Sequence, residues 1–424
     1  MRIDAIKKIE QTELIAGLLS VLFIPINKQM VVVFMLLWLV TALFNFSWAL
    51  KSGFKIDFLK KEFLAFAVLA DFYLLHVIGM FYSKNLEYGF FDLEIKMSLF
   101  IVPLLIFVRS DFYADKLILF FKSLTLGIVF SFFINLSFAY LAYVEDGSRL
   151  NFYYSKLSSQ IHPSYMALYV SLALLGMIYY NKKHQLFANK KLSLFVKIFV
   201  FVILVTYLFL LSSKAGIIAF SVALVMYVAM RLIKRLKLIT VIIISIFLLV
   251  LPFLIVSKIP NVNMRFKEIS MVFKNPEKSN IDSEYGSLAR MAIIKAGWEL
   301  SGDNLPWGVG TGDVKDAIID YHQQNGSERF PSNYLNAHNQ FAQSTIALGV
   351  LGILFLSLFF VFGFVFAYRQ KKLLLFVFMI MLFIHFLFES MFETQAGVVF
   401  IVLFYSLMLA DERNLINSNP HLKK

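Results

Sequence analysis

Repeated long apolar runs constrain this chain more than any other feature. A helix needs about 20 apolar residues to cross the hydrocarbon core of a bilayer, and it satisfies its own backbone hydrogen bonds there. We therefore predict an all-α polytopic membrane protein with about 12 transmembrane helices. The predicted spans are residues 13–27, 30–50, 63–81, 97–108, 117–143, 163–180, 196–212, 215–230, 238–257, 339–367, 373–388 and 395–410.

The composition agrees with a membrane protein. Of the 424 residues, 59% are hydrophobic and 16% are charged, and the mean hydropathy is +0.75, so one globular core could not hide the apolar surface. The chain has no cysteine, which excludes disulfides, thiolate metal sites and a cysteine nucleophile. The basic N-terminus resembles a signal peptide, but no small-residue cleavage site follows it, and we interpret the first apolar run as a span.

The basic residues predict the orientation of the spans. The net charge of +13 would suggest nucleic acid in a soluble protein, but here the basic residues cluster in alternate short loops, as the positive-inside rule requires. This alternation predicts that both termini are cytoplasmic. The short outer loops hold only Lys28, Lys84, Lys96, Arg149, Lys156 and Lys214.

One long hydrophilic segment lies on the predicted outer face. We divide the chain into residues 1–257 with spans one to nine, residues 258–338 as this outer loop, and residues 339–424 with spans ten to twelve and a cytoplasmic tail. Loops carry binding and catalytic residues more often than scaffolds do. We therefore expect catalytic residues in the segment 258–338.

Histidines stand where two outer segments enter the membrane. His338, followed by Asn339, can act as a general base or donate to a phosphate, although a lone histidine is more often structural. His162 precedes Pro163, and Tyr165 follows in the same helix, where an interfacial aromatic belt is an equal alternative.

The outer segments also carry charges that topology alone does not require. Lys214 in a tight turn needs an anionic ligand or a carboxylate to compensate it. Glu389 and Glu393 could cap helices or orient basic residues. The glycines of residues 306–312 permit a turn whose backbone amides could face a phosphate, although Gly-rich turns are common. The arginines of the outer segments are Arg149, Arg265 and Arg290.

Several short segments, taken in order, resemble the bacterial O-antigen ligase/O-antigen polymerase family. Each segment is degenerate, so the resemblance depends on their order, on the topology and on the long outer loop before His338. The segments are residues 79–85 (GMFYSKN), 93–96 (LEIK), 162–169 (HPSYMALY), 211–216 (LSSKAG), 290–298, 306–310 (PWGVG), His338-Asn339 with Gly349 and Gly352, and 389–393 (ESMFE).

The resemblance implies a metal-independent, cofactor-free glycosyltransferase of the C-type superfamily in the bacterial inner membrane. It implies transfer of a glycan from undecaprenyl diphosphate to lipid A–core, or to another glycan, on the periplasmic face. By position, His338 and Arg290 would be catalytic, and Arg149, Lys214, Arg265 and Arg290 would bind the donor diphosphate. Supporting roles would fall to His162, Tyr165, Asn339, Glu389 and Glu393.

Other functions fit parts of the pattern. A polymerase that extends lipid-linked repeats shares every motif with a ligase, because only the acceptor differs. A secondary transporter also matches twelve spans, but transporters place binding groups near the midplane and show repeated halves. An inactive scaffold would need no basic residues converging on the outer face.

Overall fold

The computed structural model describes residues 2–51, 61–180, 190–257, 287–324 and 336–411, and these residues form helices and turns without a β-strand. The elements before residue 190 are α1 (Arg2–Phe23), α2 (Lys28–Lys51), α3 (Lys61–Gly79), η1 (Met80–Tyr82), α4 (Leu86–Lys96), α5 (Ser98–Val108), α6 (Ser110–Tyr113), α7 (Leu117–Asp146), η2 (Arg149–Phe152), α8 (Tyr154–Leu157) and α9 (Pro163–Tyr180). The later ones are α10 (Lys190–Leu210), α11 (Lys214–Leu232), α12 (Leu238–Ser257), α14 (Ser287–Asp303), α15 (Val314–Gln324), α16 (Gln340–Arg369), α17 (Leu373–Phe388), η4 (Met391–Glu393) and α18 (Gln395–Ala410).

The helix lengths and hydropathies confirm an all-α membrane fold. Within the described residues, 6 helices are long and apolar enough to cross a membrane, namely α2, α7, α9, α10, α11 and α16. Shorter apolar helices cover residues 66–82, 238–251, 373–388 and 395–410. Two predicted spans differ: α1 begins at Arg2 instead of residue 13, and α5 has only 11 residues. At about 1.5 Å per residue, α5 alone is too short for a core of about 30 Å.

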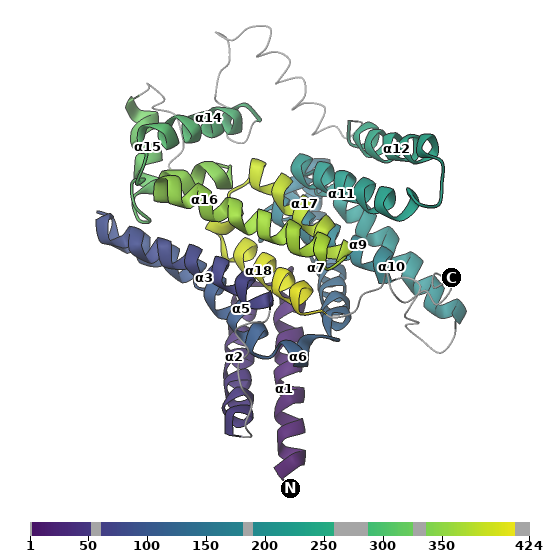
Figure 1. The fold of residues 1–424 in the computed structure, drawn as a ribbon. Coiled ribbons are helices and arrows are strands. Elements are labelled where there is room, and N and C mark those ends of the chain that lie inside the picture. Colours follow the sequence, from purple (N-terminus) through teal and green to yellow (C-terminus); the bar gives the residue numbers. More distant parts are fainter. Residues whose placement is uncertain (1, 52–60, 181–189, 258–286, 325–335, 412–424) are drawn as a thin grey trace.

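The most buried helices lie in the middle of the molecule. Figure 1 shows α17 and α18 at its centre with α16 beside them, while α1 and α2 project together from the rest. Every residue of α18 from Gly397 to Ala410 is buried, whereas α2, α10 and α12 carry exposed large apolar side chains. A bilayer is the solvent that such faces require.

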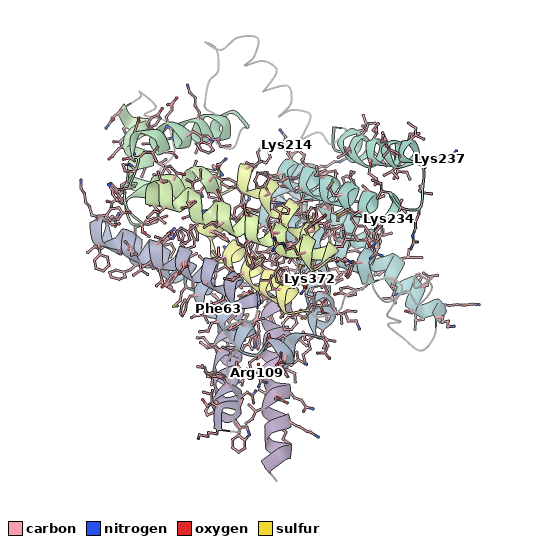
Figure 2. All side chains as sticks on the ribbon, viewed as in Figure 1. Phe63, Arg109, Lys214, Lys234, Lys237 and Lys372 are labelled. Atoms are coloured by element: carbon pink, nitrogen blue, oxygen red, sulfur yellow. The ribbon has the colours of Figure 1, made fainter. Side chains whose placement is uncertain are left out.

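A buried polar cluster joins the α1–α2 pair to the chain around α6. Glu13 is fully buried and accepts hydrogen bonds from Tyr113 Oη at 2.6 Å and Asn45 Nδ2 at 2.5 Å. Arg109, labelled in Figure 2, lies 3.2 Å from the same carboxylate. A buried carboxylate is stable only when paired in this way, so the cluster fixes how α1 and α2 attach.

α16 is broken at Gly349, and the break is filled by the Gly-rich loop. Gly349 has φ 60° and ψ −140°, a conformation essentially restricted to glycine. The amides of Val309 and Gly310 donate to the carbonyls of Ile346 and Ala347 at 2.8 and 3.0 Å. The suggestion that these amides face a phosphate is therefore wrong, because the interrupted helix already occupies them.

Candidate functional site

The candidate site is built around Glu389, which lies between α17 and η4. Its Oε2 is 3.2 Å from His338 Nδ1, and its Oε1 accepts a hydrogen bond from Ser164 Oγ at 2.8 Å. The Glu389 side chain is 5% exposed and that of His338 is 14% exposed. Segments that stand far apart in the sequence thus meet at one buried carboxylate.

Local structure fixes His338 at the entrance to α16. His338 has a positive φ of 47°, and its amide donates to Asn336 Oδ1 at 3.0 Å. Asn339 caps α16 by accepting from the Ala342 amide at 3.0 Å, and its Nδ2 donates to the Leu387 carbonyl at 3.1 Å. These bonds tie the start of α16 to the end of α17, which brings His338 to Glu389.

The N-terminus of α9 contributes Ser164 to the candidate site. Pro163 is the first residue of α9, where its missing N–H costs nothing. His162 Nδ1 accepts from the Ser164 amide at 3.3 Å, and Tyr165 Oη donates to the Ser390 carbonyl at 3.3 Å. His162 and Tyr165 thus hold Ser164 and the chain beside Glu389 in place.

The turn before α11 reaches the same site. Ser213 caps α11, and its Oγ lies 3.5 Å from Ser164 Oγ. Gly216 permits this approach, because a Cβ there would lie 2.4 Å from Ala167. Lys214 is the first residue of α11 and is half-buried; Figure 2 shows it at the end of the helix away from Lys234.

Within the described residues, the predicted arginines are connected to the candidate site less directly than Lys214. Arg149 lies in η2 with an exposed side chain, and the described residues show no ion pair for it. Arg290 belongs to α14, but its side chain lies outside the described residues, as does the whole of Arg265. α14 itself packs on the site, because a Cβ on Gly297 would lie 2.9 Å from Ala337.

A second buried cluster holds Glu393 next to the first. Lys96 Nζ lies 2.9 Å from Glu393 Oε2 and 2.5 Å from Asp92 Oδ1, and the Lys96 side chain is 1% exposed. Gln340 Nε2 donates to Glu393 Oε1 at 3.2 Å, and Gln340 Oε1 accepts from the Phe392 amide at 2.7 Å. Glu393 therefore connects α4 to the first turn of α16, two residues after His338.

Burial and charge set the protonation of this cluster. Burial raises the pKa of Asp92 to about 7, and Glu393 adds to the effect. Burial alone would lower the pKa of Lys96, but the two carboxylates raise it above its usual value. Burial would likewise raise the pKa of Glu393, but Lys96 lowers it below its usual range. The cluster thus holds a firm Lys96–Glu393 ion pair beside a carboxyl that titrates near neutral pH.

Several residues of these clusters were absent from the sequence-based site, among them Ser164, Lys96 and Gln340. Ser164 follows His162 and Pro163 directly, and Lys96 is a cation in a predicted outer loop, which the positive-inside rule disfavours. Both features could have marked them. Gln340 carries no such signal, because one amide in an amide-rich segment predicts no contact with a distant carboxylate.

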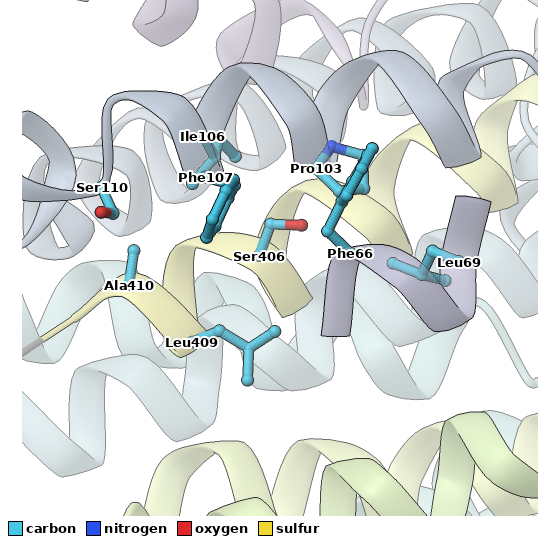
Figure 3. A pocket seen from close by; sticks show the side chains of 9 residues that line it. All are labelled: Phe66, Leu69, Pro103, Ile106, Phe107, Ser110, Ser406, Leu409 and Ala410. Carbon is cyan, nitrogen blue, oxygen red and sulfur yellow. The ribbon is translucent and has the colours of Figure 1, made fainter. Parts of the chain in front are cut away.

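The cavity in Figure 3 does not accommodate a substrate. It lies between α3, α5 and α18, is lined by residues such as Phe66, Pro103 and Ser406, and has a volume of ≈ 10 Å³. That is room for about one water molecule. No group of three His, Asp or Glu side chains that could hold a metal ion occurs within the described ranges.

Part of the chain is similar to a known protein family. Residues 199–357 match the O-antigen ligase family. This match supports membership of the O-antigen ligase/polymerase family. The match runs from α10 to the first half of α16, so it includes Ser213, Lys214, Arg290 and His338. No curated protein matches the chain. The match supports a ligase- or polymerase-type function in general for this integral membrane protein.

Proposed function

We propose that this chain is a glycosyltransferase that moves a glycan from undecaprenyl diphosphate to lipid A–core at the periplasmic face of the bacterial inner membrane. The observation that supports it most is the contact of His338 with buried Glu389 at 3.2 Å. His338 lies inside the segment that matches the O-antigen ligase family, and Glu389 lies beyond its end. A histidine oriented by a carboxylate is a common general base. In this proposal the reaction needs no metal or cofactor.

The chemistry assigned to His338 is removal of the acceptor proton. With Nδ1–H donating to Glu389, the lone pair of the imidazole is on Nε2 and takes the proton of the acceptor hydroxyl. The acceptor oxygen forms a bond to C1 of the donor sugar while the bond from C1 to the diphosphate oxygen breaks, and its electron pair leaves with the diphosphate. Attack from the opposite face inverts the anomeric centre.

The cations are proposed to bind the donor diphosphate and to stabilise the charge that grows as it leaves. A guanidinium binds two phosphate oxygens at once, whereas a lysine supplies a point charge. Lys214 is supported best, because its neighbour Ser213 lies 3.5 Å from Ser164. Arg290 is supported by the packing of its helix against Ala337. Arg149 and Arg265 complete the proposed set because both stand in the predicted outer segments.

The same proposal assigns the chain regions. Residues 258–338 are the periplasmic segment that carries Arg290 and His338, flanked by transmembrane regions 1–257 and 339–424 with both termini cytoplasmic. α14 and α15 show that this segment is largely helical where it is described, and not an extended loop.

Acceptor dependence tests the proposal. The purified protein would be given a glycan on undecaprenyl diphosphate, with and without lipid A–core, and the products would be separated by mass. We expect glycan joined to lipid A–core, with the anomeric configuration inverted. Longer glycan formed without lipid A–core would make the protein a polymerase, and an untouched donor would favour a transporter.

A further inference from the structure

A large cavity lies between α7, α9 and α10, at the opposite end of α9 from Glu389. Its volume is ≈ 520 Å³. Ser164 is the second residue of α9, whereas the cavity is lined by Gly176 and Tyr180 in the last turns of that helix. About 12 residues of helix correspond to roughly 18 Å, so this cavity is separate from the candidate site.

The walls of the cavity are apolar and open towards lipid. Its lining includes Phe121, Val129, Met177 and Val200. The hydroxyl of Thr125, which also lines it, donates a hydrogen bond to the Phe121 carbonyl at 2.8 Å. The remaining wall faces outward, because large apolar residues there are about half exposed, at 48% for Leu126 and 55% for Ile198. Such a slot accepts a hydrocarbon chain from the bilayer.

Two cations are the only charged residues among the described residues that line this cavity. Lys122 on α7 and Lys197 on α10 stand on either side of it, and no carboxylate is among these lining residues. Lysines near the end of a span extend their ammonium groups towards the headgroup region. An apolar slot lined by two ammonium groups is complementary to a lipid whose headgroup is an anion.

We propose that this cavity binds one anionic phospholipid, with an acyl chain along Phe121 and Val129 and the headgroup phosphate between Lys122 and Lys197. By the predicted topology these lysines face the cytoplasmic leaflet. The bound lipid fills the space between α7, α9 and α10 and stabilises their packing. This site is distinct from the donor site and does not depend on the transfer reaction.

Lipid retention by the purified full-length protein tests this inference. Protein in detergent would be titrated with phosphatidylglycerol or phosphatidylcholine, and bound lipid would be counted by native mass spectrometry. Three variants would be compared with the wild type: K122A/K197A, V129W to fill the slot, and K234A/K237A as a control pair. Lys234 and Lys237 are exposed, belong to the loop between α11 and α12, and do not line the cavity (Figure 2).

We expect one retained phosphatidylglycerol, preferred over phosphatidylcholine on the order of tenfold by the wild type and by the control pair. K122A/K197A should lose this preference, and V129W should lose the retained lipid altogether. Equal retention of the two lipids by the wild type would overturn the inference. So would an unchanged preference in K122A/K197A, or an equal loss in the control pair.

Discussion

Glu389 shows what a single residue contributes to the candidate site. Its carboxylate is buried and contacts both Ser164 and His338. The sequence predicted a carboxylate at a helix end that either caps it or orients basic groups. It could not predict the partner, because the meeting of α9, α16 and α17 depends on packing over the whole bundle. The role of His338 itself stays a prediction.

Replacing Glu389 by glutamine separates its charge from its shape. The glutamine side chain would still accept from Ser164, but it would no longer stabilise a protonated His338. We expect kcat for glycan transfer to fall by roughly 10- to 100-fold with little change in the KM of the donor, because the lost interaction is strongest in the transition state. Steady-state transfer kinetics measure both constants. A Glu389→Gln enzyme with wild-type kcat would show that the carboxylate does not act through His338.

Asp92 predicts a pH dependence of stability. Because burial raises its pKa to about 7, the folded protein keeps a proton that the unfolded chain releases near pH 4. The free energy of unfolding therefore falls as pH rises from about 4 to about 7, by about 1 kcal/mol per pH unit, and levels off above about pH 7. Thermal unfolding of the wild type between pH 5 and pH 8 should show this decline, and Asp92→Asn should lack it. Parallel profiles would mean that Asp92 is already ionised when folded.

At the scale of elements, α16 shows where pattern-based prediction stops. Its apolar run predicted one continuous span at 339–367, and the helix does extend from Gln340 to Arg369. The break at Gly349 was not predictable, because glycine is common in transmembrane helices and the loop that fills the break comes from residues 306–310. The glycines of that loop indicate a tight turn, but its amides donate to the carbonyls of the broken helix and not to a phosphate.

Gly349 should therefore tolerate no side chain. A Cβ there would lie 1.8 Å from the Pro306 carbonyl oxygen, in a backbone conformation that disfavours every other residue. We expect Gly349→Ala to destabilise the protein by roughly 2–4 kcal/mol and to displace the start of α16. Gly302→Ala is the matched control, because a Cβ at Gly302 in α14 meets nothing within 4 Å. Equal melting temperatures for the two variants would refute this account of the break.

For the whole molecule, the apolar runs predicted the fold class well, because span length follows from bilayer thickness. The runs at 13–27 and 97–108 were the exceptions. α1 extends over charged residues, and the short α5 directly follows α4, whose buried Lys96 pairs with Asp92 and Glu393. Hydropathy averaged along the sequence cannot detect such pairing between charges that are distant in the chain. The basic residues predict that both termini are cytoplasmic, and this orientation remains a prediction.

The absence of cysteine allows a direct test of that orientation. Single cysteines would be introduced at two exposed lysines, Lys156 on the predicted outer side and Lys234 on the predicted inner side. In cells with a permeabilised outer membrane, a membrane-impermeant maleimide should label Lys156→Cys at once. It should label Lys234→Cys only after the inner membrane is opened. The reverse pattern would place the candidate site on the cytoplasmic side.

The most direct test of the central claim is glycan transfer by the purified His338→Ala protein. With an undecaprenyl-diphosphate donor and lipid A–core, we expect its rate to fall about 10²- to 10⁴-fold, since it has lost its general base. The control is His322→Ala, a histidine in α15 that is not part of the Glu389 cluster, which should keep near wild-type transfer. Transfer by His338→Ala at the wild-type rate would contradict the account and assign the chemistry to another residue.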